Sequence, residues 1–212
     1  MSKLKVMSAP SIRRLPSYLL VAREIQEEGQ EYLSATYVAN RLGFEPIQVR
    51  KDLAITGISG RPKKGYPVKE LVATIEHFLR WDEEHRAIVV GAGNLGSALI
   101  GYSGFTTHGL RFVAAFDSNP AKAGQQIHGV PVLPMDELAG RVVDLKVSLA
   151  LLTVPRDKAQ DLTDRLVAAG ITAIWNFTNC KVKAPDSVVV QNEDLSSGFA
   201  MLSVKRRLVE IG

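Results

Sequence analysis

A glycine-rich run is the part of the sequence best suited to hold a ligand: Gly91-Ala92-Gly93-Asn94-Leu95-Gly96. It directly follows an apolar stretch typical of a buried strand and opens a helical stretch, which is the context that a dinucleotide-binding fingerprint requires. The first glycine allows a tight turn, the second lets a pyrophosphate approach the backbone, and the third lets helix and strand pack closely. Free N–H groups at the helix start favour an anion. We therefore expect all six residues to contribute to a nucleotide site.

An acidic residue completes this fingerprint. Asp117 ends the next expected strand, 21 residues after Gly96, where a carboxylate accepts hydrogen bonds from ribose hydroxyls and repels a 2′-phosphate. Residues 118–120 supply no arginine for such a phosphate, although Lys122 is near. The sequence therefore predicts NAD(H), not NADP(H), as the ligand. The alternative is a nucleotide-binding fold that holds no ligand.

A second group of candidates lies on a helix expected from Pro46 to about Ile55. Val49 and Leu53 are four residues apart and should face the core, which leaves the polar side chains of Gln48, Arg50 and Lys51 on the exposed side. Arginine and lysine can donate to guanine, and glutamine can pair with adenine. These residues occupy the first turns of the helix, where recognition helices meet base edges.

Further basic residues follow in a Gly- and Pro-rich stretch: Arg61, Lys63 and Lys64. Residues 1–69 carry a net charge of +6, from twelve basic and six acidic residues, whereas residues 70–86 carry −3 and residues 87–212 carry +1. A basic excess confined to one part of a chain is typical of nucleic-acid binding. The alternative is a solvated basic surface with no partner.

The first third of the chain must position these cations. Apolar residues at three- and four-residue spacing predict a helix over 12–28, and Ser34 and Gly43 are suited to begin and end a second helix. With the helix from Pro46, this is the pattern of a helix-turn-helix. Residues 57–67 suit a short hairpin with a basic tip, a wing, and residues 68–80 are again helical. We predict a winged-helix DNA-binding domain over residues 1–80.

The rest of the chain alternates strand and helix. Strands are expected at 87–91, 111–117, 130–134, 146–154, 171–177 and 187–192, with helices between most of them. Such alternation predicts an α/β fold with a doubly wound parallel sheet. We therefore expect a linker at 81–86, a Rossmann NAD(H)-binding domain at 87–195 and a C-terminal helix at 196–212.

Composition excludes several classes of protein. The 212 residues are 46% hydrophobic and 23% charged, which excludes a disordered chain. No apolar run reaches the length of a transmembrane helix, and one cysteine with four scattered histidines predicts no metal site. We expect a cytoplasmic protein with no membrane partner.

Together these motifs resemble the Rex family of redox-sensing transcriptional repressors. The resemblance covers nearly the whole chain and is carried by Arg14-Leu15-Pro16-x-Tyr18, Gln48-Val-Arg-Lys-Asp-Leu53, Gly65-Tyr66, Val90 to Gly96, Tyr102-x-Gly-Phe105, Phe116-Asp117, Thr153-Val-Pro155, Asn176-Phe177 and Asp194-Leu195. The most specific feature is that Gln48-Val-Arg-Lys-Asp-Leu53 is followed later in the chain by Val90 to Gly96.

The resemblance implies a homodimeric repressor that binds an inverted-repeat operator. Its C-terminal helix is exchanged between subunits, NADH favours a form that cannot bind DNA, and NAD⁺ competes with NADH. The resemblance also implies further cofactor-binding residues, namely Tyr102, Thr153, Val154, Pro155 and Asn176. It assigns the redox switch to Tyr102 and Asp194.

The sequence departs from the family at one position that bears on this switch. Members commonly have an arginine in the first helix that pairs with the aspartate matching Asp194, and that position is Leu20 here. Arg23 lies one turn further along and is a candidate substitute, with Arg13 a weaker one. We therefore expect less discrimination between NADH and NAD⁺.

Two other functions stay open at this point. The first is a small NAD-dependent dehydrogenase, but only about 20 residues follow the sixth expected strand and no dyad suggests a general base. We therefore predict no catalytic residues and no enzyme activity. The second is a DNA-binding regulator gated by another adenine nucleotide.

Overall fold

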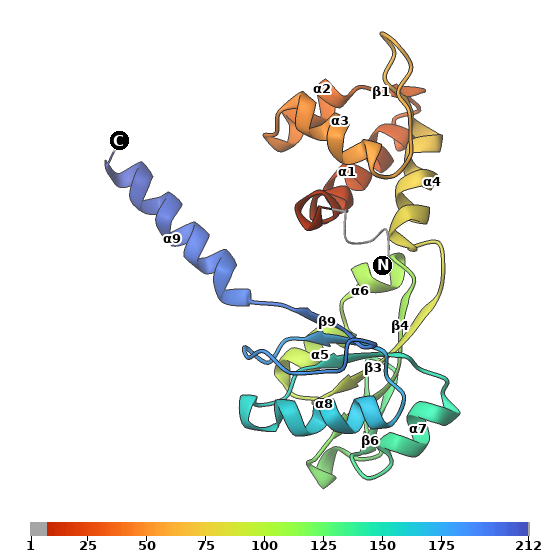
Figure 1. The fold of residues 1–212 in the computed structure, drawn as a ribbon, viewed down its shortest axis with the longest axis vertical. Helices are drawn as coiled ribbons and strands as arrows, with labels where there is room; N and C mark the ends of the chain where they lie inside the picture. The colour runs from red at the N-terminus through yellow and green to blue at the C-terminus, as the bar shows by residue number, and fades with distance from the viewer. Residues whose placement is uncertain (1–7, 212) are drawn as a thin grey trace. The chain divides into compact units, whose positions relative to one another are not determined.

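The computed structural model describes residues 8–211, which form two compact units divided between Glu83 and Glu84. This division lies inside the segment 81–86 that we expected to link two domains. Figure 1 shows a helical N-terminal unit and a sheet-containing C-terminal unit. Each unit has its own buried core.

The N-terminal unit contains four helices within the described residues: α1 (Ala9–Glu27), α2 (Ala35–Leu42), α3 (Pro46–Ala54) and α4 (Val68–Leu79). The expected end signals operate as predicted. Ser34 accepts a hydrogen bond from the Tyr37 N–H at 3.1 Å, and Gly43 ends α2 in the left-handed conformation with φ 71°. Pro46 takes the first position of α3. The helix-turn-helix therefore follows from local signals.

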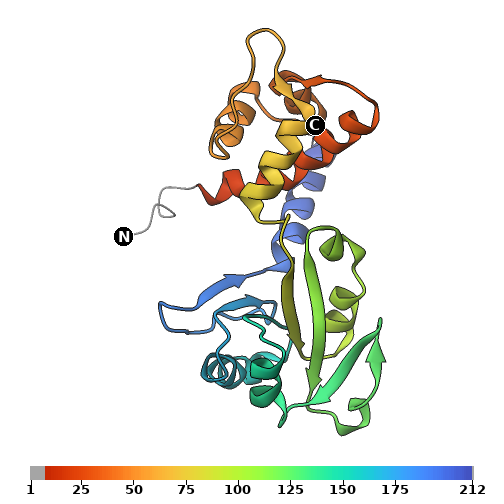
Figure 2. The ribbon, with the colours of Figure 1, turned by 90° about the vertical axis from the view of Figure 1, so that its right-hand side faces the viewer.

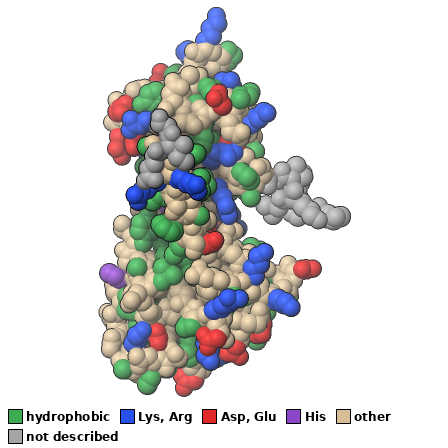
Figure 3. Space-filling model, turned by 90° about the vertical axis from the view of Figure 1, so that its left-hand side faces the viewer, with side chains coloured by type: hydrophobic (Ala, Val, Ile, Leu, Met, Phe, Trp, Pro, Cys, Tyr) green, Lys and Arg blue, Asp and Glu red, His purple; other side chains and the backbone are tan. Residues whose placement is uncertain are grey.

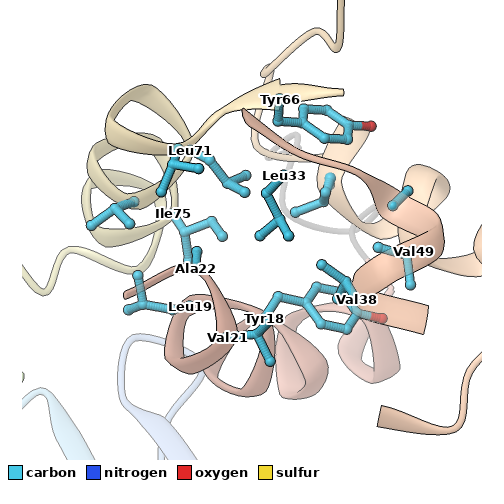
Figure 4. Close-up of a cluster of buried hydrophobic side chains, with 14 of the residues drawn as sticks. Tyr18, Leu19, Val21, Ala22, Leu33, Val38, Val49, Tyr66, Leu71 and Ile75 are labelled. Atoms are coloured by element: carbon cyan, nitrogen blue, oxygen red, sulfur yellow. The ribbon is translucent and has the colours of Figure 1, made fainter. Parts of the chain in front are cut away.

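These helices enclose one apolar core (Figure 4). Tyr18 and Leu19 of α1, Val49 of α3, and Leu71 and Ile75 of α4 are all within 1% of complete burial. Since they come from helices far apart in the sequence, burial of this core sets the position of α3 relative to α1 and α4.

The expected wing has a strand partner that we did not predict. Arg61 and Gly65 form an isolated antiparallel bridge at the base of the turn. β2 (Tyr66–Pro67) then pairs antiparallel with β1 (Tyr32–Leu33), which lies between α1 and α2. A two-residue strand has no periodicity to detect, so only the folded chain reveals this pairing.

The C-terminal unit contains a seven-stranded sheet with the order β5-β6-β4-β3-β7-β8-β9 (Figure 2). The strands are β3 (His85–Val90), β4 (Leu110–Asp117), β5 (Gln126–Ile127), β6 (Val130–Pro134), β7 (Leu149–Leu152), β8 (Ala173–Asn176) and β9 (Val189–Asn192). All pairings are parallel except that of β5 with β6. Without β5, the six strands follow the Rossmann order 3-2-1-4-5-6.

Helices cover both faces of this sheet, as continuous apolar strands require. Ile88 and Val90 point into one core and Ala87 and Val89 into the other. The helices are α5 (Asn94–Ile100), α6 (Ser103–Thr107), α7 (Leu138–Asp144) and α8 (Ala159–Ala168), with single 3₁₀ turns at Pro120–Lys122 and Arg156–Lys158. The structure contains a strand in each of the six regions where the sequence predicted one. The sequence did not predict β5, α6 or the first 3₁₀ turn, and the strand expected over 146–154 is shorter, at Leu149–Leu152.

The chain closes with α9 (Leu195–Ile211), the expected C-terminal helix. Its large apolar side chains are exposed, including Phe199, Leu202 and Leu208. Among residues 8–211, no helix has both the length and the apolar character needed to cross a membrane.

Candidate functional site

The glycine-rich turn has the backbone that its sequence predicts. Gly91 has φ 102°, a conformation that favours glycine. A side chain on Gly96 would overlap the Gly91 carbonyl oxygen, whereas a side chain on Gly93 would meet nothing within 4 Å. Thr153, the residue after β7, supports the turn, since its hydroxyl donates to the Gly91 carbonyl at 2.7 Å. The turn therefore presents an open backbone edge at Gly93.

A pocket of about 410 Å³ lies beside this edge. Six predicted residues line it: Gly91, Gly93, Asp117, Thr153, Val154 and Pro155. The remaining lining residues were not predicted, namely Phe116, Ser118, Met135, Lys158, Asp161, Leu162 and Arg165. Most of these belong to α8 or to the loops after β4 and β6, at the carboxyl ends of the strands, where such folds bind ligands.

Asp117 is not a free carboxylate in this pocket. Its Oδ1 accepts the Asn119 N–H at 2.8 Å, and its Oδ2 accepts the Lys122 ammonium at 3.0 Å. Lys122 also donates to the Ala92 carbonyl at 2.8 Å. Lys122 therefore joins the end of β4 to the glycine-rich turn. The sequence placed Lys122 nearby, but its two partners depend on the fold.

The α3 helix exposes both of its cations as predicted, but Gln48 differs from the prediction. Val49 and Leu53 are buried, and Arg50 and Lys51 are exposed. Gln48 is half-buried, which contradicts our expectation of an exposed side chain: its amide donates to Asp52 Oδ1 at 2.8 Å. A base contact by Gln48 must therefore use the remaining amide atoms.

Asp52 is the centre of a buried polar network that the sequence did not predict. Its side chain is 0% exposed and accepts Arg14 Nε at 2.6 Å, Arg14 Nη2 at 2.9 Å and the Tyr18 hydroxyl at 2.7 Å. Burial raises the pKa of Asp52, but hydrogen bonds from Arg14, Tyr18, Ser11 and Gln48 outweigh it and hold that pKa well below its usual range. Burial and the bond to Asp52 raise the pKa of Tyr18. The network ties α3 to α1.

The wing cations surround a groove of about 460 Å³. Arg50, Arg61, Lys63 and Lys64 line it together with residues at the start of α2. Arg61 donates to the Tyr32 hydroxyl at 2.6 Å and lies 5.5 Å from the centre of its ring, and Lys64 lies 5.1 Å from that centre. Cations gather at the tip of this unit, at the top of Figure 3. The groove therefore suits a phosphate backbone.

Comparisons with known proteins agree with both halves of this geometry. A model of a putative DNA-binding protein N-terminus matches residues 7–54, and a CoA binding domain model matches residues 82–180. The chain is 57% identical over 204 residues to the redox-sensing transcriptional repressor Rex of Treponema denticola, covering 96% of this chain and 97% of that one. The chain belongs to the Rex family of redox-sensing transcriptional repressors.

Other Rex-family proteins extend this likeness. The Rex repressor of Bacteroides fragilis is 38% identical over 202 residues, which cover 95% of this chain and 92% of that one. Among solved structures, RSP in complex with β-NAD⁺ and operator DNA has a TM-score of 0.89 at 33% identity, covering 97% of this chain and 95% of that chain. RSP in complex with β-NADH has a TM-score of 0.88 at 32% identity.

The two residues expected to form the Rex-family switch, Tyr102 and Asp194, make separate contacts in the structure. Tyr102 is 58% exposed and packs edge-on against Phe105, with 4.9 Å between ring centres. Asp194 is exposed, and its Oδ1 accepts the Ser196 N–H at the start of α9 at 2.8 Å. Among the described residues of this single chain, no hydrogen bond joins Tyr102 to Asp194.

Asn176, expected from the Rex resemblance to bind the cofactor, does not line the pocket. It is 1% exposed, and its amide donates to the Cys180 carbonyl at 2.6 Å and to Asn192 Oδ1 at 2.8 Å. Its oxygen accepts from both the N–H and the hydroxyl of Thr178. These hydrogen bonds hold the loop after β8 against β9.

Arg23, the candidate substitute for the arginine missing at Leu20, has a partner within its own unit. Its guanidinium is paired with Glu76 of α4 at 2.7 Å and 3.2 Å. Leu20 is 60% exposed, so the departure from other Rex-family sequences lies on the surface of α1.

The described residues contain no group of three or more side chains that could hold a metal ion.

Proposed function

We propose that this chain is a DNA-binding transcriptional repressor that senses the ratio of NADH to NAD⁺ and is released from operator DNA by NADH. The observation that carries this proposal is the likeness to RSP across 97% of the chain, because that repressor has been solved with NADH and, separately, with NAD⁺ and operator DNA. A basic helix and wing in one unit and an open nucleotide pocket in the other support the same function.

The residues of the pocket fit a dinucleotide. The open side of Gly93 leaves room for a pyrophosphate against the backbone, and Asp117 provides the acceptor for ribose hydroxyls. Phe116, Met135 and Leu162 supply apolar surface suited to a flat adenine ring. We assign the six predicted lining residues to NAD(H), with Ala92, Asn94, Leu95 and Gly96 shaping the turn.

We propose that α3 reads the operator and that the wing binds its backbone. Arg50 and Lys51 are exposed and would donate to base edges in the major groove. Gln48 would help to orient Asp52, which Arg14 and Tyr18 of α1 also contact. Arg61, Lys63 and Lys64 line the groove at the wing and would neutralise phosphates. The operator is then an inverted repeat, because a twofold protein presents two identical helices.

We further propose a homodimer, acting in the cytoplasm, in which α9 is exchanged between subunits. Exposed apolar side chains repeated along α9 need a protein partner to leave water. Since no hydrogen bond joins Tyr102 and Asp194 within one chain, the switch cluster would form between Tyr102 of one copy and Asp194 of a second. Deleting residues 196–212 should convert the dimer to a monomer in sedimentation velocity, and the same deletion should abolish operator binding. A truncated protein that is still a dimer and still binds DNA would refute this assembly.

The decisive experiment measures binding to the DNA upstream of the protein's own gene. Fluorescence anisotropy of labelled DNA should fall when NADH is titrated, and NAD⁺ should restore binding in competition. Release by ATP or ADP but not by NADH would favour a regulator gated by another adenine nucleotide. Steady oxidation of NADH with an aldehyde or keto acid, without DNA binding, would favour the dehydrogenase.

A further inference from the structure

The ammonium of Lys122 contacts Asp117, a pocket residue expected to bind the adenosine ribose, although Lys122 is not itself among the residues that line the pocket. Its Nζ lies 3.0 Å from Asp117 Oδ2 and 2.8 Å from the Ala92 carbonyl, and the side chain is 33% exposed against 12% for Asp117. Two of its three N–H groups are thus used, and within the described residues the third has no hydrogen-bond partner. This cation is held beside the acid that selects a ribose hydroxyl.

The pairing changes what Asp117 does. A lone carboxylate excludes a 2′-phosphate by charge repulsion, but here an ammonium in contact with the carboxylate cancels much of that repulsion. The Asn119 N–H and Lys122 occupy one oxygen each, so the carboxylate is held in one orientation toward the pocket. Asp117 and Lys122 would therefore together determine whether the site accepts the ribose hydroxyls or a 2′-phosphate.

We propose that Lys122 is a specificity-determining residue of the nucleotide site: it orients Asp117 for an unmodified ribose and becomes the ligand of a 2′-phosphate once the Asp117 charge is removed. This inference rests on the proposed function, since it concerns the same NAD(H) site. It implies that the wild-type protein rejects NADPH less strongly than a site with an unpaired aspartate would.

The test is a double-mutant cycle on the full chain. NADH and NADPH affinities are measured by the fluorescence of the bound nicotinamide for the wild type, Asp117→Ala, Lys122→Met and the double variant. Asp117→Ala should move the preference toward NADPH by about tenfold or more, the value of one charge-assisted hydrogen bond. The double variant should bind NADPH about tenfold more weakly than Asp117→Ala, because it lacks the ammonium. Lys122→Met alone should bind NADPH more weakly than the wild type, because its Asp117 carboxylate is unpaired.

Lys158 provides the control, because it is a lysine that lines the pocket and it is paired with Asp157 at 3.6 Å, not with Asp117. In a Lys158→Met background, Asp117→Ala should shift the preference as fully as in the wild type. Equal NADPH affinity of Asp117→Ala and the double variant, or a loss of NADPH affinity that depends on Lys158 instead, would overturn the inference. A wild type that binds neither nucleotide would overturn the proposed function as well, and circular dichroism identifies any variant that fails to fold.

Discussion

Removing the carboxylate of Asp52 should destabilise the packing of α3 against α1, although Asp52 is not expected to contact DNA or nucleotide. Asp52→Ala leaves the Arg14 guanidinium and the Tyr18 hydroxyl facing a site that is 0% exposed. Losing one partner of a buried ion pair costs about 3–5 kcal/mol of unfolding free energy. Water reaches the side chain of Arg14, which is 24% exposed, so we expect a loss of about 3 kcal/mol.

Hydrogen exchange followed by mass spectrometry can measure this loss in the full chain. A loss of about 3 kcal/mol corresponds to roughly 100-fold faster exchange of the α1 and α3 amides that open with the whole domain, while β3 and β4 should be unchanged. Operator affinity should fall and NADH affinity should not. The matched control is Glu24→Gln, which removes an exposed ion pair between α1 and α2, Arg41 with Glu24 at 3.2 Å, and should cost about 0–1 kcal/mol.

The same network sets an acid limit on the N-terminal domain. Because the folded-state pKa of Asp52 lies below its value in the unfolded chain, its stabilisation is fully present above the unfolded pKa, near 4, and is lost as the pH falls through the folded pKa. Asp52→Asn should remove this part of the acid dependence of the urea midpoint. In the hydrogen-exchange experiment, two results would refute our account of the network. One is amide exchange in α3 of Asp52→Ala as slow as in the wild type, and the other is a loss of unfolding free energy no larger than that of Glu24→Gln.

The other predictions concern the DNA, the nucleotide and the switch. Lys51→Ala should abolish operator selectivity, at roughly 1–3 kcal/mol per half-site, whereas Lys64→Ala should weaken all DNA alike and flatten the salt dependence by about one unit per contact in anisotropy titrations. Gly93→Ala should fold normally but lose NADH in fluorescence titration, whereas Gly96→Ala should lower the melting temperature because its side chain meets the Gly91 carbonyl; equal NADH affinity in Gly93→Ala contradicts our pyrophosphate site. Asp194→Ala should reduce NADH-induced release of DNA while DNA and NADH each still bind; unchanged release would exclude Asp194 from the switch.

Much of the fold follows from signals that act within a few residues. The Ser34 cap, the Gly43 stop and the positive φ of Gly91 each depend on one residue and its immediate neighbours. Apolar runs such as residues 87–90 of β3 and Leu149–Leu152 of β7 predict buried strands without knowledge of their partners. The sequence alone therefore determined the two-domain plan, the helix-turn-helix and the glycine-rich turn, because local backbone preferences and burial periodicity encode them.

Contacts between distant residues were decided by the tertiary structure. Arg14 and Asp52 are 38 residues apart, and nothing local in the sequence shows that these two side chains pair. In the same way, nothing in the local sequence shows that the buried Asn176 side chain bonds to the Cys180 carbonyl and to Thr178. A polar side chain is satisfied by whichever donor or acceptor the folded chain brings to it. That choice depends on packing across the whole domain, which no single stretch of sequence contains.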